Sequence, residues 1–180
     1  MGLPNIVVNF KTTGITAITR SEKGIVALIV RDSGGIGSYE MDDITDMPSG
    51  ISAENIAYIK RAFVGYQTPP KKVLVDVIGA DTAISDALKW AETQEFDYIC
   101  APPSTADTDA AEVASWVKSQ RANEDRKFKA VLPNSASDSE GIINFTTTNI
   151  KTSEGTFTPA QFASRIAGLI AGTPMTISCT

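Results

Sequence analysis

The sequence contains no histidine among its 180 residues. Histidine is the usual general base, the usual partner of a serine or cysteine nucleophile, and the commonest transition-metal ligand in proteins. Any catalysis would therefore have to depend on carboxylates, lysines or a cofactor. We expect a protein that is not an enzyme, with no catalytic residue, no metal site and no cofactor.

Cysteine is scarce, since the chain has only Cys100 and Cys179. Two cysteines are too few for a disulfide scaffold, and each lies in an apolar stretch where a buried free thiol is the ordinary role. A nucleophilic Cys100 would need a base to form its thiolate, and the usual base is missing.

The chain also lacks an excess of positive charge: 16 lysines and arginines against 21 acidic residues give a net charge of -5. Nucleic-acid binding depends on clustered cations that displace counterions, so no nucleic-acid partner is expected. No apolar run approaches the roughly 20 residues that cross a bilayer, and the N-terminus has no basic segment followed by an apolar stretch. These absences predict a cytosolic protein with no membrane-spanning segment.

Short apolar runs alternate with helical patterns along the chain. Ile25 to Val30 is continuously apolar, which is typical of a strand covered on both faces. Further strands are expected over residues 73–78, 96–101, 127–132 and 142–146. Helices are expected after the cap residues Ser52, Asp81 and Thr158, and over residues 109–120. Strands separated by helices imply right-handed crossovers, so we predict an α/β fold: a layered sandwich with a mostly parallel sheet flanked by helices, preceded by an extended N-terminal arm.

The last helix has the most complete boundary signals. Thr158 and Gln161 have the spacing of a capping box, with Pro159 at the first helical position. The apolar face of this helix is expected to consist of Phe162, Ile166, Leu169 and Ile170.

A domain boundary is expected near residues 20–24, where a polar link interrupts the pattern. Residues 1–22 form the predicted arm, and residues 23–180 form the α/β body. Within the arm, Ile6, Val8 and Phe10 would lie on one side of an extended strand.

Glycines at Gly34–Gly37 follow the first strand of the body, which is where a dinucleotide-binding fold keeps its phosphate loop. Such a loop opens directly into a helix, whereas here residues 38–40 lead into the acidic, non-helical stretch 42–46. We therefore interpret the glycines as a structural turn.

Four carboxylates near strand ends could in principle converge on Mg²⁺: Asp32, Asp76, Asp81 and Asp97. Three have simpler roles, since Asp81 can cap a helix, Asp32 can begin a turn, and Asp97 lies at a strand entrance, away from the usual ligand edge. Asp76 lies within a strand and has no such role. An α/β nucleotide- or metal-binding enzyme domain therefore stays open as the alternative function.

Three stretches carry a resemblance to a known family: residues 2–29, the segment Gly141–Phe145, and residues 163–174 with the ending 178–180. Together they resemble the N-terminal part of a contractile tail sheath subunit, the family that includes phage tail sheaths, prophage remnants and contractile bacteriocins. The helix followed by Gly172-Thr173-Pro174 is the most specific of the three.

The resemblance implies a structural subunit that polymerises around an inner tube and contracts to drive it through a target envelope, without nucleotide hydrolysis. The implied partners are other copies of the full-length chain, the inner tube protein and the baseplate. The implied location is the bacterial cytoplasm during assembly and then a released particle, a virion or a bacteriocin.

The resemblance also implies that extended terminal arms add strands to a neighbouring subunit's sheet. The arm residues expected to lie between subunits are Ile6, Val8, Phe10, Ile15 and Ile18. Residues 176–180 are expected to begin another strand. Sheath subunits are considerably longer than this chain, which stops there, so a shortened or processed form is expected. A generic interaction module that docks its N-terminal strand on an unrelated partner is a third hypothesis.

Overall fold

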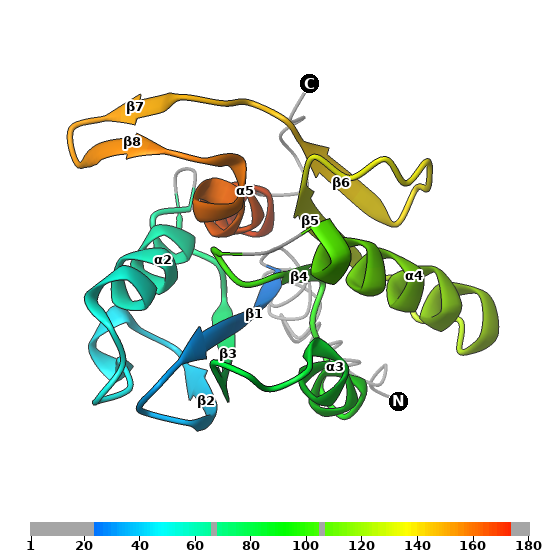
Figure 1. Ribbon diagram of the computed structural model, residues 1–180, viewed down its shortest axis with the longest axis horizontal. Coiled ribbons are helices and arrows are strands. Elements are labelled where there is room, and N and C mark those ends of the chain that lie inside the picture. The colour runs from blue at the N-terminus through cyan, green and yellow to red at the C-terminus, as the bar shows by residue number, and fades with distance from the viewer. Residues whose placement is uncertain (1–23, 66–67, 105–106, 174–180) are drawn as a thin grey trace, which may run out of the picture.

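Strand β1 (Ile25–Asp32) lies inside the main sheet, as its apolar sequence predicts. The computed structural model describes residues 24–65, 68–104 and 107–173, and over these residues the main sheet has six strands in the order β2-β3-β1-β4-β5-β6 (Figure 1). The other five strands are β2 (Gly37–Met41), β3 (Lys72–Gly79), β4 (Tyr98–Cys100), β5 (Lys129–Pro133) and β6 (Ile142–Phe145). All neighbours pair in parallel except β2, which is antiparallel to β3.

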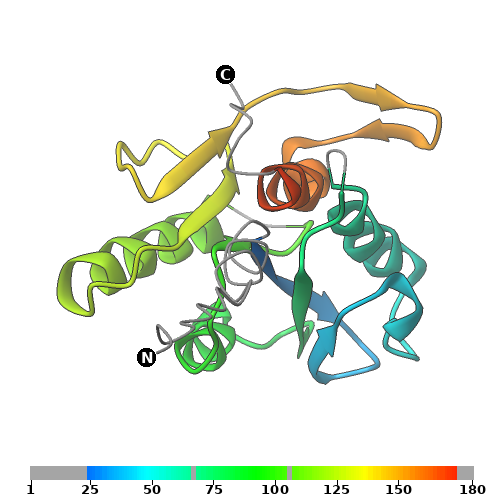
Figure 2. The same ribbon diagram turned by 180° about the vertical axis from the view of Figure 1, so that it is seen from behind.

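Helices cover both faces of this sheet, so the predicted layered α/β sandwich is confirmed (Figures 1 and 2). Helices α3 (Ile84–Glu92) and α4 (Asp107–Asn123) lie on one face, and α2 (Ala53–Phe63) and α5 (Pro159–Gly172) lie on the other. Alternate residues of β1 enter the two layers: Ala27 and Ile29 pack toward α3 and α4, while Leu28 packs toward α2 and α5. Both faces of β1 are therefore buried, which is why its sequence is apolar without alternation.

Two of the three predicted helix caps are confirmed. The Ser52 hydroxyl accepts a hydrogen bond from the backbone of Asn55 at the start of α2. Thr158 and Gln161 form the predicted capping box of α5, with N···O distances of 3.0 and 3.2 Å. The third prediction is wrong: the residue that caps α3 is Ala83, with no side-chain bond, and Asp81 is exposed. Helix α3 begins two residues later than predicted, with Ala83 at the N-cap position, so Asp81 lies before the residue that could cap it.

The predicted apolar face of α5 is also wrong. The buried side of the helix is made of small residues: Ala163, Ser164, Ala167, Gly168, Ala171 and Gly172. The large residues expected inside, Phe162, Ile166, Leu169 and Ile170, are only partly buried. The cause is the close approach of α2, since a Cβ built on Gly168 would lie 1.9 Å from the backbone oxygen of Ala62. Only a face of small side chains allows two helix backbones to come this near.

Two extended elements were not predicted. Strand β2 forms an edge of the sheet directly after the glycine turn, where no strand was predicted, and Tyr39 pairs with Val75 there. Strands β7 (Ile150–Thr152) and β8 (Gly155–Phe157) form a separate two-stranded hairpin. A short 3-10 helix, η1 (Ile44–Asp46), follows β2.

The start of β1 and the end of α5 lie side by side. The backbone nitrogen of Gly24 donates to the carbonyl of Ala171 (2.8 Å), and the nitrogen of Lys71 donates to the carbonyl of Gly24 (3.0 Å). The predicted arm residues Ile6, Val8, Phe10, Ile15 and Ile18, and the strand expected at residues 176–180, lie outside the described residues.

Candidate functional site

The carboxyl ends of β1 and β4 are the place where an open parallel sheet usually binds a ligand, because the strand order reverses between them. Asp32 ends β1 at this point. Its Oδ2 accepts hydrogen bonds from the backbone nitrogen of Ser52 (2.7 Å) and from Nδ2 of Asn55 (2.8 Å), and its Oδ1 accepts from the nitrogen of Ser33 (2.7 Å). The carboxylate at the expected ligand edge therefore holds the start of α2.

The electrostatics of Asp32 agree with this structural role. The hydrogen bond from the Ser52 backbone, helped by those from Asn55 and Ser33, lowers the pKa of Asp32 well below its usual range, although burial opposes the change. The glycine turn that follows is packed just as closely, since a Cβ on Gly34 would lie 2.5 Å from the carbonyl oxygen of Gly50. Tight backbone packing explains this glycine, which supports a structural turn over a phosphate loop.

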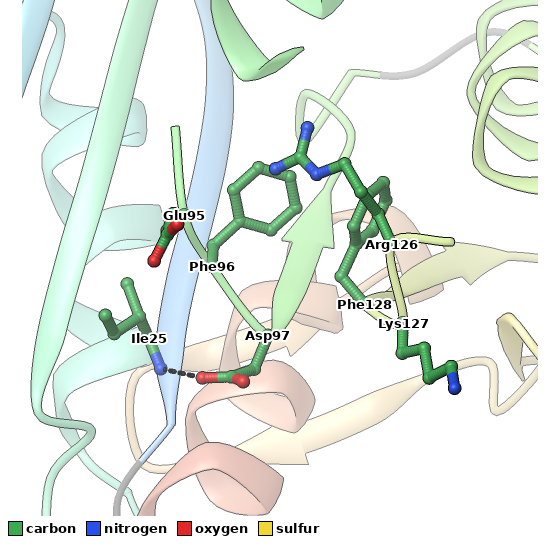
Figure 3. Close-up of a pocket in the computed structure, with 7 residues that line it drawn as sticks. All are labelled: Ile25, Glu95, Phe96, Asp97, Arg126, Lys127 and Phe128. Carbon is green, nitrogen blue, oxygen red and sulfur yellow. Dashed lines mark hydrogen bonds between the residues drawn. The ribbon is translucent and has the colours of Figure 1, made fainter. Parts of the chain in front are cut away.

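The other candidate carboxylates have separate environments. The buried Asp76 accepts a 2.7 Å hydrogen bond from the Ser38 hydroxyl on β2, and burial raises its pKa. Asp97 accepts a 2.7 Å hydrogen bond from the backbone nitrogen of Ile25 at the strand entrance (Figure 3). Across the described ranges, no group of three or more histidine, cysteine, aspartate or glutamate residues could hold a metal ion.

The pH dependence of stability tests whether the charge of Asp76 is needed. Because the pKa of Asp76 is raised in the folded state, the free energy of unfolding should fall as the pH rises from about 4, the usual aspartate pKa, through the folded-state pKa. Asp76→Asn keeps an acceptor for Ser38 without the charge, so we expect it to raise the free energy of unfolding at pH 7 by roughly 0–1 kcal/mol. Chemical denaturation at pH 7 and pH 3 measures this, and the gain should vanish at pH 3. A variant clearly less stable than the parent chain at pH 7 would show that the charge is needed.

Cys100 is fully buried, and burial raises the pKa of its thiol. Next to it, the buried Tyr58 hydroxyl donates to the carbonyl of Ala101 at 2.8 Å. A protonated thiol enclosed in the core is not available as a nucleophile, as the sequence indicates. Cys179 lies outside the described residues.

A cavity of about 350 Å³ opens at the amino ends of β1, β4 and β5 (Figure 3). Its lining residues are Ile25, Glu95, Phe96, Asp97, Arg126, Lys127 and Phe128. The guanidinium of Arg126 lies over the rings of Phe96 (5.5 Å) and Phe128 (5.0 Å), and it donates to backbone carbonyls of Glu92 and Gln94 at the end of α3. No pattern in the sequence singles out Arg126, because its partners are backbone carbonyls more than 30 residues away. The guanidinium of Arg126 therefore stabilises the fold through these contacts.

No helix within residues 24–65, 68–104 and 107–173 combines the length and the apolar character that crossing a bilayer requires.

Comparisons with known proteins agree on one family. A family model described as the phage tail sheath protein central domain matches residues 79–180. The tail sheath protein of Clostridium phage phiCD119 is 36% identical over 184 residues, an alignment that covers 99% of this chain and 51% of the relative. The phage-like element PBSX protein XkdK of Bacillus subtilis (strain 168) is 36% identical over 97 residues, covering 53% of this chain and 21% of the relative.

Two solved structures share the fold. A sheath tail protein from Desulfitobacterium hafniense superposes with a TM-score of 0.72 at 18% identity, covering 98% of this chain and 64% of the other. A sheath tail protein from Listeria innocua gives a TM-score of 0.72 at 17% identity, with coverages of 92% and 61%.

The fold is an α/β domain with a mostly parallel sheet, in which Asp32 and Asp97 accept hydrogen bonds from the chain's own backbone and Asp76 accepts one from the Ser38 hydroxyl. The chain belongs to the phage tail sheath protein family, whose central-domain model matches more than half of it. The resemblance seen in the sequence is thereby confirmed. The chain spans about half the length of its phiCD119 relative.

Proposed function

We propose that this chain forms part of a sheath subunit that polymerises around an inner tube and contracts to drive the tube through a target envelope. The match to the sheath central domain, together with 36% identity to a phage tail sheath protein along nearly the whole chain, carries the proposal. In this proposal the free energy that drives contraction is stored in assembly, without nucleotide hydrolysis.

The proposal assigns residues 1–22 to an arm and residues 23–180 to the α/β body. Its support is the position of Gly24, which is bonded to both Ala171 and Lys71 at the amino ends of the parallel strands. The apolar arm residues Ile6, Val8, Phe10, Ile15 and Ile18 contact a neighbouring subunit by strand addition.

The proposed partners are further copies of the full-length subunit, the inner tube protein and the baseplate, with no nucleic acid among them. The proposed location is the bacterial cytoplasm during assembly, followed by a released virion or bacteriocin particle.

Electron microscopy of the full-length subunit produced together with its tube protein tests this function. The expected result is a tubular lattice, and deletion of residues 1–22 should leave a folded body that no longer forms the lattice. Replacing Ile6, Val8 and Phe10 by serine should have the same effect, whereas serine at the three intervening positions Val7, Asn9 and Lys11 is the matched control. Subunits that stay monomeric in every assembly condition would contradict the proposal.

A further inference from the structure

The β7–β8 hairpin stands apart from the main sheet. Its two strands pair only with each other among the described residues, and it extends across α5 toward the side of α2 (Figures 1 and 2). Every residue from Lys151 to Thr156 is exposed. An isolated two-stranded hairpin is marginally stable at best in water, so its order depends on contacts with the body.

A row of stacked groups provides those contacts. The guanidinium of Arg61, on α2, lies 4.0 Å from the centre of the Phe157 ring at the end of β8. The ring of Phe157 stacks on that of Phe162, on α5, with centroids 6.0 Å apart, and Phe162 stacks on Phe145, on β6, at 6.3 Å.

Burial of the Arg61 guanidinium costs free energy, because a charged group is removed from water. Arg61 is only 9% exposed, its Nη1 donates to the carbonyl of Gln161 (3.0 Å), and its buried Nε has no hydrogen-bond partner among the residues that the structure describes. Within residues 24–65, 68–104 and 107–173, the carboxylate that pairs with Arg61 is that of Glu154 at the hairpin tip, whose Oε2 lies 3.9 Å from Nε: this is an ion pair but too long for a hydrogen bond, and the Glu154 side chain is 69% exposed. Closing the hairpin therefore gains a cation–π contact but leaves a charged group incompletely satisfied.

The balance changes when the hairpin lifts away. Water can then reach Nε of Arg61 and restore its hydrogen bonding, which offsets part of the lost ring contact. Opening therefore loses the cation–π contact and the 3.9 Å ion pair with the exposed Glu154, and hydration of Nε offsets only part of that loss.

The flanking segments allow such a motion without disturbing the body. Residues 146–149 are all exposed, and Asn149 has a φ of 54°, a left-handed conformation found in turns. On the other side, the capping box between Thr158 and Gln161 fixes the start of α5 by bonds that do not involve the hairpin.

We propose that the β7–β8 hairpin is a strap that opens as a unit while the α/β body stays folded, and that Arg61 sets the fraction of molecules in which it is open. Opening removes Phe157 from the ring of Phe162 on α5 and from the guanidinium of Arg61 on α2, and so uncovers both. Closing covers them again. Arg61 is thus a positioning residue for the strap.

Hydrogen exchange of the native chain at low denaturant concentration tests the proposal. Amides bonded across β7 and β8 should exchange through an opening that is nearly independent of denaturant, since little surface is exposed. Amides of β1 should exchange only through global unfolding, with a steep denaturant dependence.

A matched pair of variants on α2 assigns the role to Arg61. We expect Arg61→Gln to accelerate exchange in the hairpin by about five- to tenfold, because the cation–π contact is lost while the cost of burying Nε without a partner is removed with it, and we expect exchange of β1 to change less. Lys60→Gln removes the same charge from an exposed position next to it and should change the hairpin by less than about threefold.

Two results would overturn the strap. One is that hairpin amides of the unaltered chain exchange as slowly, and with the same denaturant dependence, as those of β1. The other is that Arg61→Gln accelerates β1 and the hairpin equally. The first measurement needs no variant, so it decides whether the hairpin opens while the body stays folded even where Arg61→Gln fails to fold. Neither result depends on assembly into a sheath.

Discussion

Replacement of Gly168 by alanine is expected to lower the free energy of unfolding by about 3 kcal/mol. The added Cβ would lie 1.9 Å from the backbone oxygen and 2.7 Å from the backbone carbon of Ala62. A backbone atom cannot turn away as a flexible side chain can, so α2 and α5 must separate. Separation also weakens the 2.7 Å hydrogen bond from the Ser164 hydroxyl to the carbonyl of Tyr58.

The sign of this result is diagnostic. In a solvent-exposed helix, glycine to alanine stabilises by about 1 kcal/mol, because alanine is the better helix former. A loss of stability at Gly168 therefore measures the contact with α2 and cannot arise from helix propensity.

The neighbouring Leu169 supplies the control. Leu169→Ala removes a larger group from a partly exposed position, and we expect a cost of about 1 kcal/mol, below the range for fully buried leucines. Urea unfolding of both variants, with unchanged m-values, gives the comparison. If Leu169→Ala cost more than Gly168→Ala, the apolar side of α5 would be its buried side after all.

Helix α5 also shows what the sequence could and could not predict. Its boundaries depend on local chemistry within four residues, so the capping box at Thr158 and Gln161 was predicted correctly. Its buried face depends on how near α2 approaches, and hydrophobic periodicity contains no information about that distance. The stretch 163–174, which carried the most specific resemblance to sheath proteins, is the same stretch that holds these small residues.

The strands also differ in how well the local sequence predicts them. Strands β1 and β3 are buried on both faces, so their apolar runs predicted them with bounds close to those observed. The edge strand β2 and the β7–β8 hairpin are polar and short, and their order depends on partners elsewhere in the chain. Local patterns do not distinguish such segments from loops.

The candidate site was harder still to predict. Asp32 was expected only to begin a turn, yet two of its three closest donors come from residues 20 and 23 positions further along. Composition and spacing excluded common chemistries, whereas the family came from the resemblance and from the match to the sheath central domain.

Asp32→Asn is expected to lower the free energy of unfolding at pH 7 by about 3 kcal/mol. The carboxylate accepts the Ser33 nitrogen on one oxygen and the Ser52 nitrogen and Asn55 amide on the other. An asparagine offers one oxygen and one NH₂ group, so in either orientation its NH₂ group faces a donor. At least one donor of this partly buried network is then left unpaired, and the charge-assisted character of the remaining bonds is lost.

The same network predicts the pH dependence. Because the pKa of Asp32 is lowered in the folded state, its contribution is fully present above about pH 4 and is lost as the pH falls below the unfolded value toward the folded one. The difference between the parent chain and Asp32→Asn should therefore narrow between pH 7 and pH 3. The matched control is Asp81→Asn, an exposed carboxylate that should leave stability within about 0.5 kcal/mol at both values. A difference that stayed constant down to pH 3, or an Asp32→Asn variant as stable as Asp81→Asn, would show that α2 is held in place by its apolar contacts and not by this carboxylate.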